Sequence, residues 1–307
     1  MTKYFEPISF TQWTHDKTGF AKALGQSFRE TGFAVITDHG LDLDMIDEAI
    51  AKTKTFFALP NSAKAAYYTP EEGGRRGYTP FGTESAKGQT VADLKEFWHT
   101  GPAAVPGSTD DPIVSEVDGF NAATRALFDG LNAMGQSLLQ AVATYLGLEE
   151  TWFTPRVANG DSILRLLHYP AQDSPPPAGS VRAAAHEDIN VITLLLGAEE
   201  AGLEVQHTSG KWLGVNPPPG ALVVNIGDML HRLTNGELPS TTHRVVNPSA
   251  ERAAHPRYST PFFLHFASDV LITPLETCIA PGDDALPAIT AGDYLTERLR
   301  EIGLIKT

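Results

Sequence analysis

Apolar residues recur at helical spacing in three stretches of the first half of the chain. Phe20, Leu24 and Phe28 lie four residues apart, which places them on one face of an amphipathic helix. A second stripe of this kind ends just before Pro60, which cannot continue a helix. A third and much longer stripe covers about residues 118–146. The first half of the chain is therefore predicted to be helical and mixed, with the Gly- and Pro-rich residues 70–115 forming loops and short strands.

From Ser162 onward the pattern changes to short apolar runs that are separated by turn residues. Runs of this length predict strands, and their close spacing favours a sandwich or barrel over alternating strands and helices. Thr208-Ser209-Gly210 is typical of a hairpin turn, and residues 293–299 predict a helix near the C-terminus. The expected fold class is α+β with a mainly β core. The apolar runs cover residues 162–170, 191–196, 203–206, 211–215, 221–226, 243–247 and 257–266.

Composition narrows the classes of function. The 307 residues carry a net charge of −14 and no basic cluster beyond Arg75-Arg76, whereas binding to nucleic acid needs a basic surface. No apolar stretch approaches the roughly 18 residues of a membrane span, and the N-terminus lacks the pattern of a secretory signal. Cys278 is the only cysteine, so a disulfide within the chain is excluded. We expect a cytoplasmic protein that binds neither nucleic acid nor membrane; the sequence does not indicate an oligomeric state.

Three residues have the spacing of a metal site. His186 and Asp188 are two positions apart, so in an extended segment their side chains point to the same side. His243 opens a later apolar run, and a neighbouring strand would bring its imidazole to the same point. Two histidines and one carboxylate leave one face of an octahedral metal open, as in non-haem Fe(II) oxygenases. Zn²⁺ accepts the same donors, so a zinc hydrolase is an alternative at this point.

A second pair lies further along the chain. Arg257 and Ser259 also alternate onto one face of a predicted strand. The planar guanidinium binds two oxygens of a carboxylate at once, and the hydroxyl can add a further hydrogen bond. This pair predicts a binding site for a carboxylate-bearing molecule.

Taken in order, these motifs resemble the isopenicillin N synthase-like family of Fe(II)- and 2-oxoglutarate-dependent oxygenases. The resemblance extends over most of the chain, and the order and spacing of its segments are specific to this family. The further matching segments are Gly32-Phe-Ala-Val-Ile-Thr-Asp-His-Gly40, Phe56-Phe-Ala-Leu-Pro60, Arg76-Gly-Tyr-Thr-Pro80, Asp93-Leu-Lys-Glu-Phe97, Gly202-Leu-Glu-Val205, Trp212, Asn225-Ile-Gly-Asp228 and Thr234-Asn-Gly236.

The resemblance implies a double-stranded β-helix, or jelly roll, with the metal at one mouth. Residues 1–150 would buttress the barrel without forming an independent domain, residues 151–280 would form the oxygenase core, and residues 281–307 a helical tail. It also implies Fe(II) as cofactor, with 2-oxoglutarate and O2 as cosubstrates, and oxidation of a small-molecule substrate, with hydroxylation as the expected reaction.

The resemblance assigns roles to individual residues. His186, Asp188 and His243 would be the catalytic metal ligands. Arg257 and Ser259, assisted by Tyr169, would bind the distal carboxylate of 2-oxoglutarate. The chain departs from the family pattern at two further positions, where Leu167 replaces an asparagine and Asn190 replaces a small residue.

Residues around the substrate are less well defined by the sequence. In relatives, Arg76 and Tyr78 lie on a loop that borders substrate, although as glycine-flanked residues they could be exposed. Phe262 and Phe263 alternate sides of one strand, so Phe263 is the candidate for the pocket and Phe262 for the core. Arg165 would look into the barrel, where it needs a carboxylate from a substrate or from the protein itself.

The roles of two further histidines and three alternative functions remain to be considered. His231, the rival metal ligand, is expected to be structural, and His99 is expected at the surface rather than at the substrate mouth. An oxidase of the same family that uses no oxoacid would employ Arg257 and Ser259 to hold the substrate's own carboxylate. A zinc hydrolase is disfavoured because the chain has no His-Glu-x-x-His motif. A non-catalytic jelly-roll binding protein would not need all five motif residues.

Overall fold

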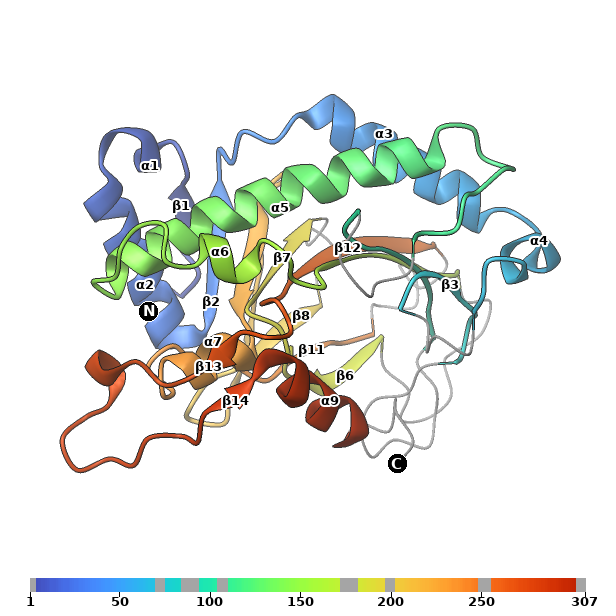
Figure 1. Cartoon of the computed structure of the whole chain (residues 1–307). Helices are drawn as coiled ribbons and strands as arrows, with labels where there is room; N and C mark the ends of the chain where they lie inside the picture. Colours follow the sequence, from blue (N-terminus) through green and yellow to red (C-terminus); the bar gives the residue numbers. More distant parts are fainter. Residues whose placement is uncertain are drawn as a thin grey trace.

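The computed structural model consists of two large β-sheets, a small two-stranded sheet, and helices of which the longest packs on one side of the larger sheet (Figure 1). It describes residues 4–69, 75–83, 94–103, 110–171, 182–196, 202–247 and 255–301. The helices are α1 (Gln12–His15), α2 (Lys17–Thr31), α3 (Leu43–Phe57), α4 (Asn61–Ala65), α5 (Phe120–Tyr145), α6 (Thr154–Val157), α7 (Asp228–Leu233), the 3₁₀ turn η2 (Glu276–Cys278) and α9 (Ala291–Glu301). The strands are β1 (Pro7–Ser9), β2 (Phe33–Thr37), β3 (Gly77–Thr79), β4 (Glu96–Thr100), β5 (Ile163–Tyr169), β6 (Ala183–His186), β7 (Ile192–Leu196), β8 (Leu203–Gln206), β9 (Trp212–Gly214), β10 (Leu222–Ile226), β11 (His243–Val245), β12 (Arg257–Leu264), β13 (Leu271–Ile272) and β14 (Ile289–Thr290).

The larger sheet has eight strands in the order β1-β2-β10-β7-β12-β5-β4-β3. Only the β1–β2 pair is parallel, and every other neighbouring pair in this sheet is antiparallel. The N-terminal part of the chain supplies β1 to β4, so both edges of the sheet come from residues before α5. The smaller sheet has the order β6-β11-β8-β9, and its β8–β9 hairpin turns at Gly210, whose φ of 78° is easily reached without a side chain.

The helices α2, α3 and α5 cover one face of the larger sheet. Figure 1 shows α5 lying across β7 and β12, with α3 alongside it and α2 at its other end. Phe262 is completely buried and meets Phe128 of α5 edge to face, with 5.2 Å between ring centroids. Gly135 allows a close approach here, because a Cβ at this position would lie 2.6 Å from a methyl carbon of Leu264. This apolar face forms the main core of the protein.

The opposite face of the same sheet, called the polar face below, carries buried polar side chains beside a second apolar cluster that includes Phe33, Val35 and Val223. Asn225, Thr193 and Ser259 are buried there, although each lies within a strand. Burying such side chains is unfavourable unless they find hydrogen-bond partners. Polar residues inside a β core therefore mark the region in which the functional residues collect.

The helices and strands that the hydrophobic pattern predicts are present. The α2 helix begins after Asp16, whose carboxylate accepts a hydrogen bond from Gly19 N–H, and each apolar run after Ser162 contains a strand. The expected α+β class is confirmed at the level of a mixed fold with two large sheets. The division at residues 150 and 280 stays a prediction. Among the described helices, none is long and apolar enough to cross a membrane.

Candidate metal centre

The two histidines of the predicted metal site are direct neighbours across two strands. His186 ends β6, His243 begins β11, and their Cα atoms are partners in the antiparallel ladder. Their imidazole centroids are 4.4 Å apart. Asp188 follows on the segment that leads to β7, and one ligand atom from each of the three residues lies within 4.8 Å of the others. Among the described residues this is the one group of histidines and carboxylates with the geometry of a metal site.

Backbone carbonyls orient both imidazoles. Nδ1 of His186 donates to the carbonyl of Ala184 at 2.7 Å, and Nδ1 of His243 donates to that of Thr241 at 3.1 Å. Because a carbonyl can only accept, each Nδ1 must carry the proton. The lone pair is then on Nε2, which lies 3.8 Å from Asp188 Oδ1 in His186 and 3.9 Å in His243. Carbonyl partners of this kind fix the tautomer that a metal requires.

The carboxylate of Asp188 is held from behind. Its Oδ2 accepts hydrogen bonds from Thr193 Oγ1 at 2.5 Å and from Asn225 Nδ2 at 2.8 Å, which turns Oδ1 toward the imidazoles. Burial alone would raise the pKa of Asp188, but the two imidazoles and these two hydrogen bonds outweigh it and lower the pKa. The ligand is therefore an oriented, ionised carboxylate. The sequence analysis did not predict Thr193 or Asn225 as site residues, although each is the one polar residue in a buried strand.

Asn190 also belongs to this support. Its amide donates to the Ile192 carbonyl at 3.0 Å and to Thr193 Oγ1 at 2.9 Å. Gly227 lies so close that a Cβ there would be 2.2 Å from the backbone oxygen of Asn190. The larger residue at position 190 thus positions the threonine that holds Asp188.

The two imidazoles differ in exposure. The ring of His243 is buried and meets Phe33 edge to face, at 5.4 Å between centroids. The side chain of His186 is 43% exposed, so this ligand stands at the edge of the site. Although part of the side chain is exposed, the protein around the ring reduces its hydration, and this effect together with the nearby His243 lowers the pKa of His186. Both effects favour the neutral imidazole that coordinates metals.

The predicted carboxylate-binding residues lie side by side on β5 and β12. Arg257 pairs with Tyr169 in the strand ladder, and its guanidinium carbon is 5.3 Å from the centre of the Tyr169 ring. Nη1 of Arg257 donates a long hydrogen bond of 3.5 Å to Ser259 Oγ. All three side chains are buried. Leu167, which replaces the family's asparagine, pairs with Ser259, so an apolar side chain adjoins the hydroxyl.

Arg76 and Tyr78 are not the exposed loop residues that the sequence allowed. Arg76 is only 2% exposed, and its guanidinium reaches Asp161 at 2.6 Å and Asp111 at 3.6 Å. The Tyr78 hydroxyl donates to the carboxylate of Glu96. Neither residue is brought to the metal ligands by these contacts, and their expected role in the substrate pocket stays a prediction.

Phe263 lies on the same side of β12 as Ser259, while Phe262 is in the core, as expected. The expectation of a surface position for His99 is wrong, because its side chain is buried on β4 and its Nε2 is 2.6 Å from Arg165 Nε. His231 lies apart from the triad on α7, where its Nδ1 accepts a hydrogen bond from the Ser240 N–H at 3.2 Å.

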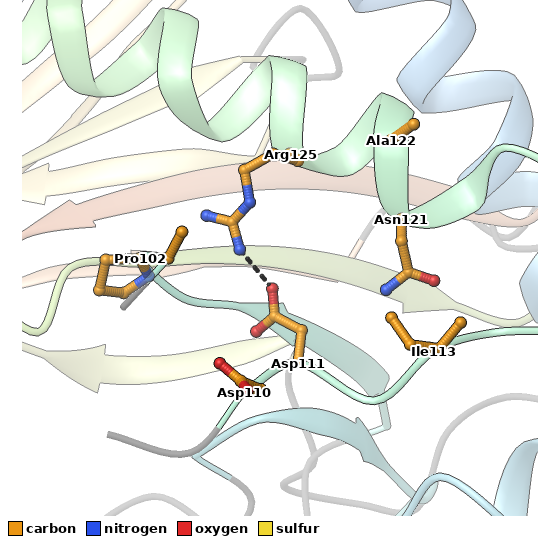
Figure 2. Close-up of a pocket in the computed structure, with 8 residues that line it drawn as sticks. Pro102, Asp110, Asp111, Ile113, Asn121, Ala122 and Arg125 are labelled. Carbon is orange, nitrogen blue, oxygen red and sulfur yellow. Dashed lines mark hydrogen bonds and ion pairs between the residues drawn. The ribbon is translucent and has the colours of Figure 1, made fainter. Parts of the chain in front are cut away.

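A surface pocket near the start of α5 is separate from this centre. Figure 2 shows that Arg125 and Asn121 project from α5 toward a loop that carries Asp111. The pocket encloses about 480 Å³, and an ion pair of 2.7 Å between Arg125 and Asp111 spans it. Its lining includes none of the metal-site residues.

Comparison with known proteins agrees with the geometry. Residues 160–266 match the family model of the 2OG-Fe(II) oxygenase superfamily, and residues 6–123 match that of the N-terminal region of non-haem dioxygenases in morphine synthesis. The chain is 31% identical to a 2-oxoglutarate-Fe(II) type oxidoreductase, ppzD, of Metarhizium rileyi, over 95% of this chain and 89% of that protein.

Solved structures of similar proteins also agree with the oxygenase family. A 2OG-Fe(II) oxygenase family protein from Caulobacter crescentus is 52% identical and superposes with a TM-score of 0.91, covering 98% of this chain and 100% of the other. A Neurospora crassa protein, solved at full length in complex with alpha-KG and thymine, is 30% identical with a TM-score of 0.87, covering 96% of each chain.

These similarities confirm the expected enzyme class. The protein is an Fe(II)-dependent dioxygenase that couples oxidative decarboxylation of 2-oxoglutarate to oxidation of a small molecule. From the order of its motifs, the geometry of its metal ligands and the extent of these matches, the chain belongs to the 2OG-Fe(II) oxygenase superfamily, in the isopenicillin N synthase-like group.

Proposed function

We propose that His186, Asp188 and His243 bind the catalytic Fe(II) and that the reaction is hydroxylation of a small-molecule substrate. The observation that carries the proposal is the convergence of two imidazole Nε2 atoms and one carboxylate oxygen. Every other polar atom of the three side chains is occupied by a hydrogen bond that points the ligand atom inward. This donor set fits Fe(II), because two nitrogens and one carboxylate hold the metal and leave coordination positions for other molecules.

When bound, Fe(II) with 2-oxoglutarate and O2 supplies the oxidising chemistry, which yields succinate, carbon dioxide and the hydroxylated product. The protein binds and orients the reactants. Arg257 offers a fixed guanidinium to the distal carboxylate of 2-oxoglutarate, and Ser259 adds a hydroxyl beside it. We propose that Tyr169, whose ring lies beside the guanidinium, assists in binding this carboxylate. Burial of all three residues strengthens these interactions by keeping water away.

The fold serves this chemistry by bringing two sheets to one centre. The smaller sheet supplies His186 and His243, and the polar face of the larger sheet supplies the supports of Asp188 and the pair Arg257 and Ser259. We propose that the two sheets are the layers of a double-stranded β-helix with the metal at its mouth. In this arrangement residues 151–280 form the oxygenase core, residues 1–150 buttress it and residues 281–307 form a helical tail.

The substrate is proposed to be a small metabolite rather than a macromolecule. The Neurospora relative binds thymine together with alpha-KG, and the net charge of −14 opposes binding to nucleic acid. A cytoplasmic location is proposed from the single cysteine, since a reducing compartment suits a chain without disulfides.

Succinate release tests the function. The purified protein, supplied with Fe(II), 2-oxoglutarate and air, is screened against small metabolites while succinate and oxygen uptake are measured together. We expect at least one compound to stimulate succinate formation in proportion to its own oxidation, and Asp188→Ala to abolish it. Substrate oxidation without succinate would instead identify an oxidase that uses no oxoacid.

A further inference from the structure

A second arginine, Arg165, lies on the polar face of the larger sheet. Leu167 of β5 pairs with Ser259 of β12, and Arg165 is two residues from Leu167 along the same strand. Alternate residues of a strand point to the same side, so Arg165 shares the face that carries Ser259. Neither metal binding nor the proposed recognition of 2-oxoglutarate uses this residue.

Contacts connect Arg165 with the metal centre through one aromatic ring. Phe263 is the strand partner of Thr193, and Thr193 donates the hydrogen bond that holds Asp188. The guanidinium carbon of Arg165 is 5.5 Å from the centre of the Phe263 ring. Partners in an antiparallel pair bring their side chains close together on one face. The ring of Phe263 therefore lies between Arg165 and Thr193, the residue that orients the metal ligand.

The guanidinium is fixed in place. Its carbon lies 4.4 Å from the centre of the Phe97 ring, and its Nε donates to Nε2 of His99 at 2.6 Å. Because an arginine Nε–H can only donate, this hydrogen bond requires a lone pair on His99 Nε2, and in the neutral ring the proton is then on Nδ1. A rigid guanidinium against an aromatic ring is a donor group with a defined plane, which is the property that bidentate recognition requires.

We propose that Arg165, positioned by His99 and Phe97, is the residue that recognises the small molecule that the enzyme oxidises. This inference rests on the proposed function. The substrate class is a compact, flat molecule that presents acceptor oxygens in the plane of its conjugated system. An aromatic carboxylate and a heterocycle with ring carbonyls share this chemistry. The ring of Phe263 lies between the Arg165 guanidinium and the metal centre. A flat molecule can pack against this ring.

Calorimetry under nitrogen tests this selection without relying on turnover. Benzoate and uracil are the two probes, each titrated into the Fe(II) protein saturated with 2-oxoglutarate. We expect at least one to bind the wild-type protein, with benzoate identifying a carboxylate and uracil identifying ring carbonyls. Arg165→Gln should weaken that binding about 10- to 100-fold, because a charge-assisted hydrogen bond is lost. Arg165→Lys should fall between the two, since it keeps the charge but loses the planar group.

Arg156→Gln is the matched control. Arg156 also stacks on an aromatic ring, with its guanidinium carbon 3.5 Å from the centre of the Trp152 ring, but it belongs to α6. Its substitution should leave probe binding unchanged. The proposal is overturned if neither probe binds, if Arg165→Gln binds as tightly as wild type, or if Arg165→Gln loses 2-oxoglutarate binding instead. Failure of the wild-type protein to bind 2-oxoglutarate at all would refute the proposed function, and the separate oxoacid titration identifies that case.

Discussion

Removing the Thr193 hydroxyl should weaken iron binding without removing any metal ligand. Thr193→Val keeps the shape of the side chain but deletes the 2.5 Å hydrogen bond to Asp188 Oδ2. Asn225 still donates to the same oxygen at 2.8 Å, so the carboxylate keeps one of its two supports. A hydrogen bond to a charged group contributes about 1.5–3 kcal/mol, and loss of a partner behind a metal ligand typically costs about 10- to 100-fold in affinity. We expect iron to bind about 10- to 100-fold more weakly.

The assay is competition for Fe(II) between the protein and a chelator of known affinity under nitrogen, with a melting curve for each variant. Thr260→Val is the matched control, because Thr260 is also a buried threonine of the same sheet but its hydroxyl is 3.5 Å from the Leu196 carbonyl. The control should change iron affinity by less than about twofold, since it contacts no metal ligand. Unchanged iron affinity in Thr193→Val with a lowered melting temperature would refute the reasoning and make Thr193 a residue of the core only.

Three further variants test other parts of the site and the fold. Arg257→Lys should weaken 2-oxoglutarate binding, and Arg257→Ala should weaken it by about one to three orders of magnitude, with iron content unchanged in both. Calorimetric titration with 2-oxoglutarate measures the affinity. A fall in melting temperature with unchanged affinity would indicate a structural ion pair. His231→Gln should leave metal content intact by elemental analysis, because His231 lies outside the triad. Glu96→Gln should destabilise the protein by about 3–5 kcal/mol at neutral pH, because it leaves the Lys64 ammonium, 2.7 Å away and buried, without its carboxylate. Burial alone would raise the pKa of Glu96, but hydrogen bonds from His168, Lys64 and Tyr78 outweigh it and lower the pKa below 4.5. The stability that the ionised Glu96 carboxylate contributes is therefore complete above pH 4.5, and it is lost as the pH falls through the lowered pKa of the folded protein. The difference in unfolding free energy between wild type and variant, measured with urea, should therefore shrink only in acid.

Periodicity predicted the elements that bury one apolar face. The stripe that contains Phe20, Leu24 and Phe28 became α2, and the run 257–266 became β12, because the spacing of apolar residues reports directly which face is buried. The short strand β6 escaped prediction. Its sequence, Ala183-Ala-Ala-His186, has no alternation of large apolar residues, and it forms because its partner β11 fixes it in the smaller sheet.

The same contrast applies to the site. The metal ligands were predictable because residues two positions apart in an extended segment, such as His186 and Asp188, point to the same side. The supports of Asp188 were not, because Thr193 and Asn225 come from different strands and meet only when β7 pairs with β10. Arg76 illustrates the opposite error. A glycine-flanked arginine suggests a loop, yet Asp161 and Asp111 draw its guanidinium into the interior, and neither carboxylate is near it in the sequence.

The most direct test of the central claim is an anaerobic titration of the Fe(II)-loaded protein with 2-oxoglutarate, followed by visible absorption. Chelation of an oxoacid by iron in this site should produce a charge-transfer band whose amplitude, at saturating 2-oxoglutarate, corresponds to one bound oxoacid per iron. Asp188→Ala, which removes the carboxylate ligand, should show neither stoichiometric iron nor the band. A wild-type protein that gives no band at saturating 2-oxoglutarate, or an Asp188→Ala variant that retains both, would contradict the account.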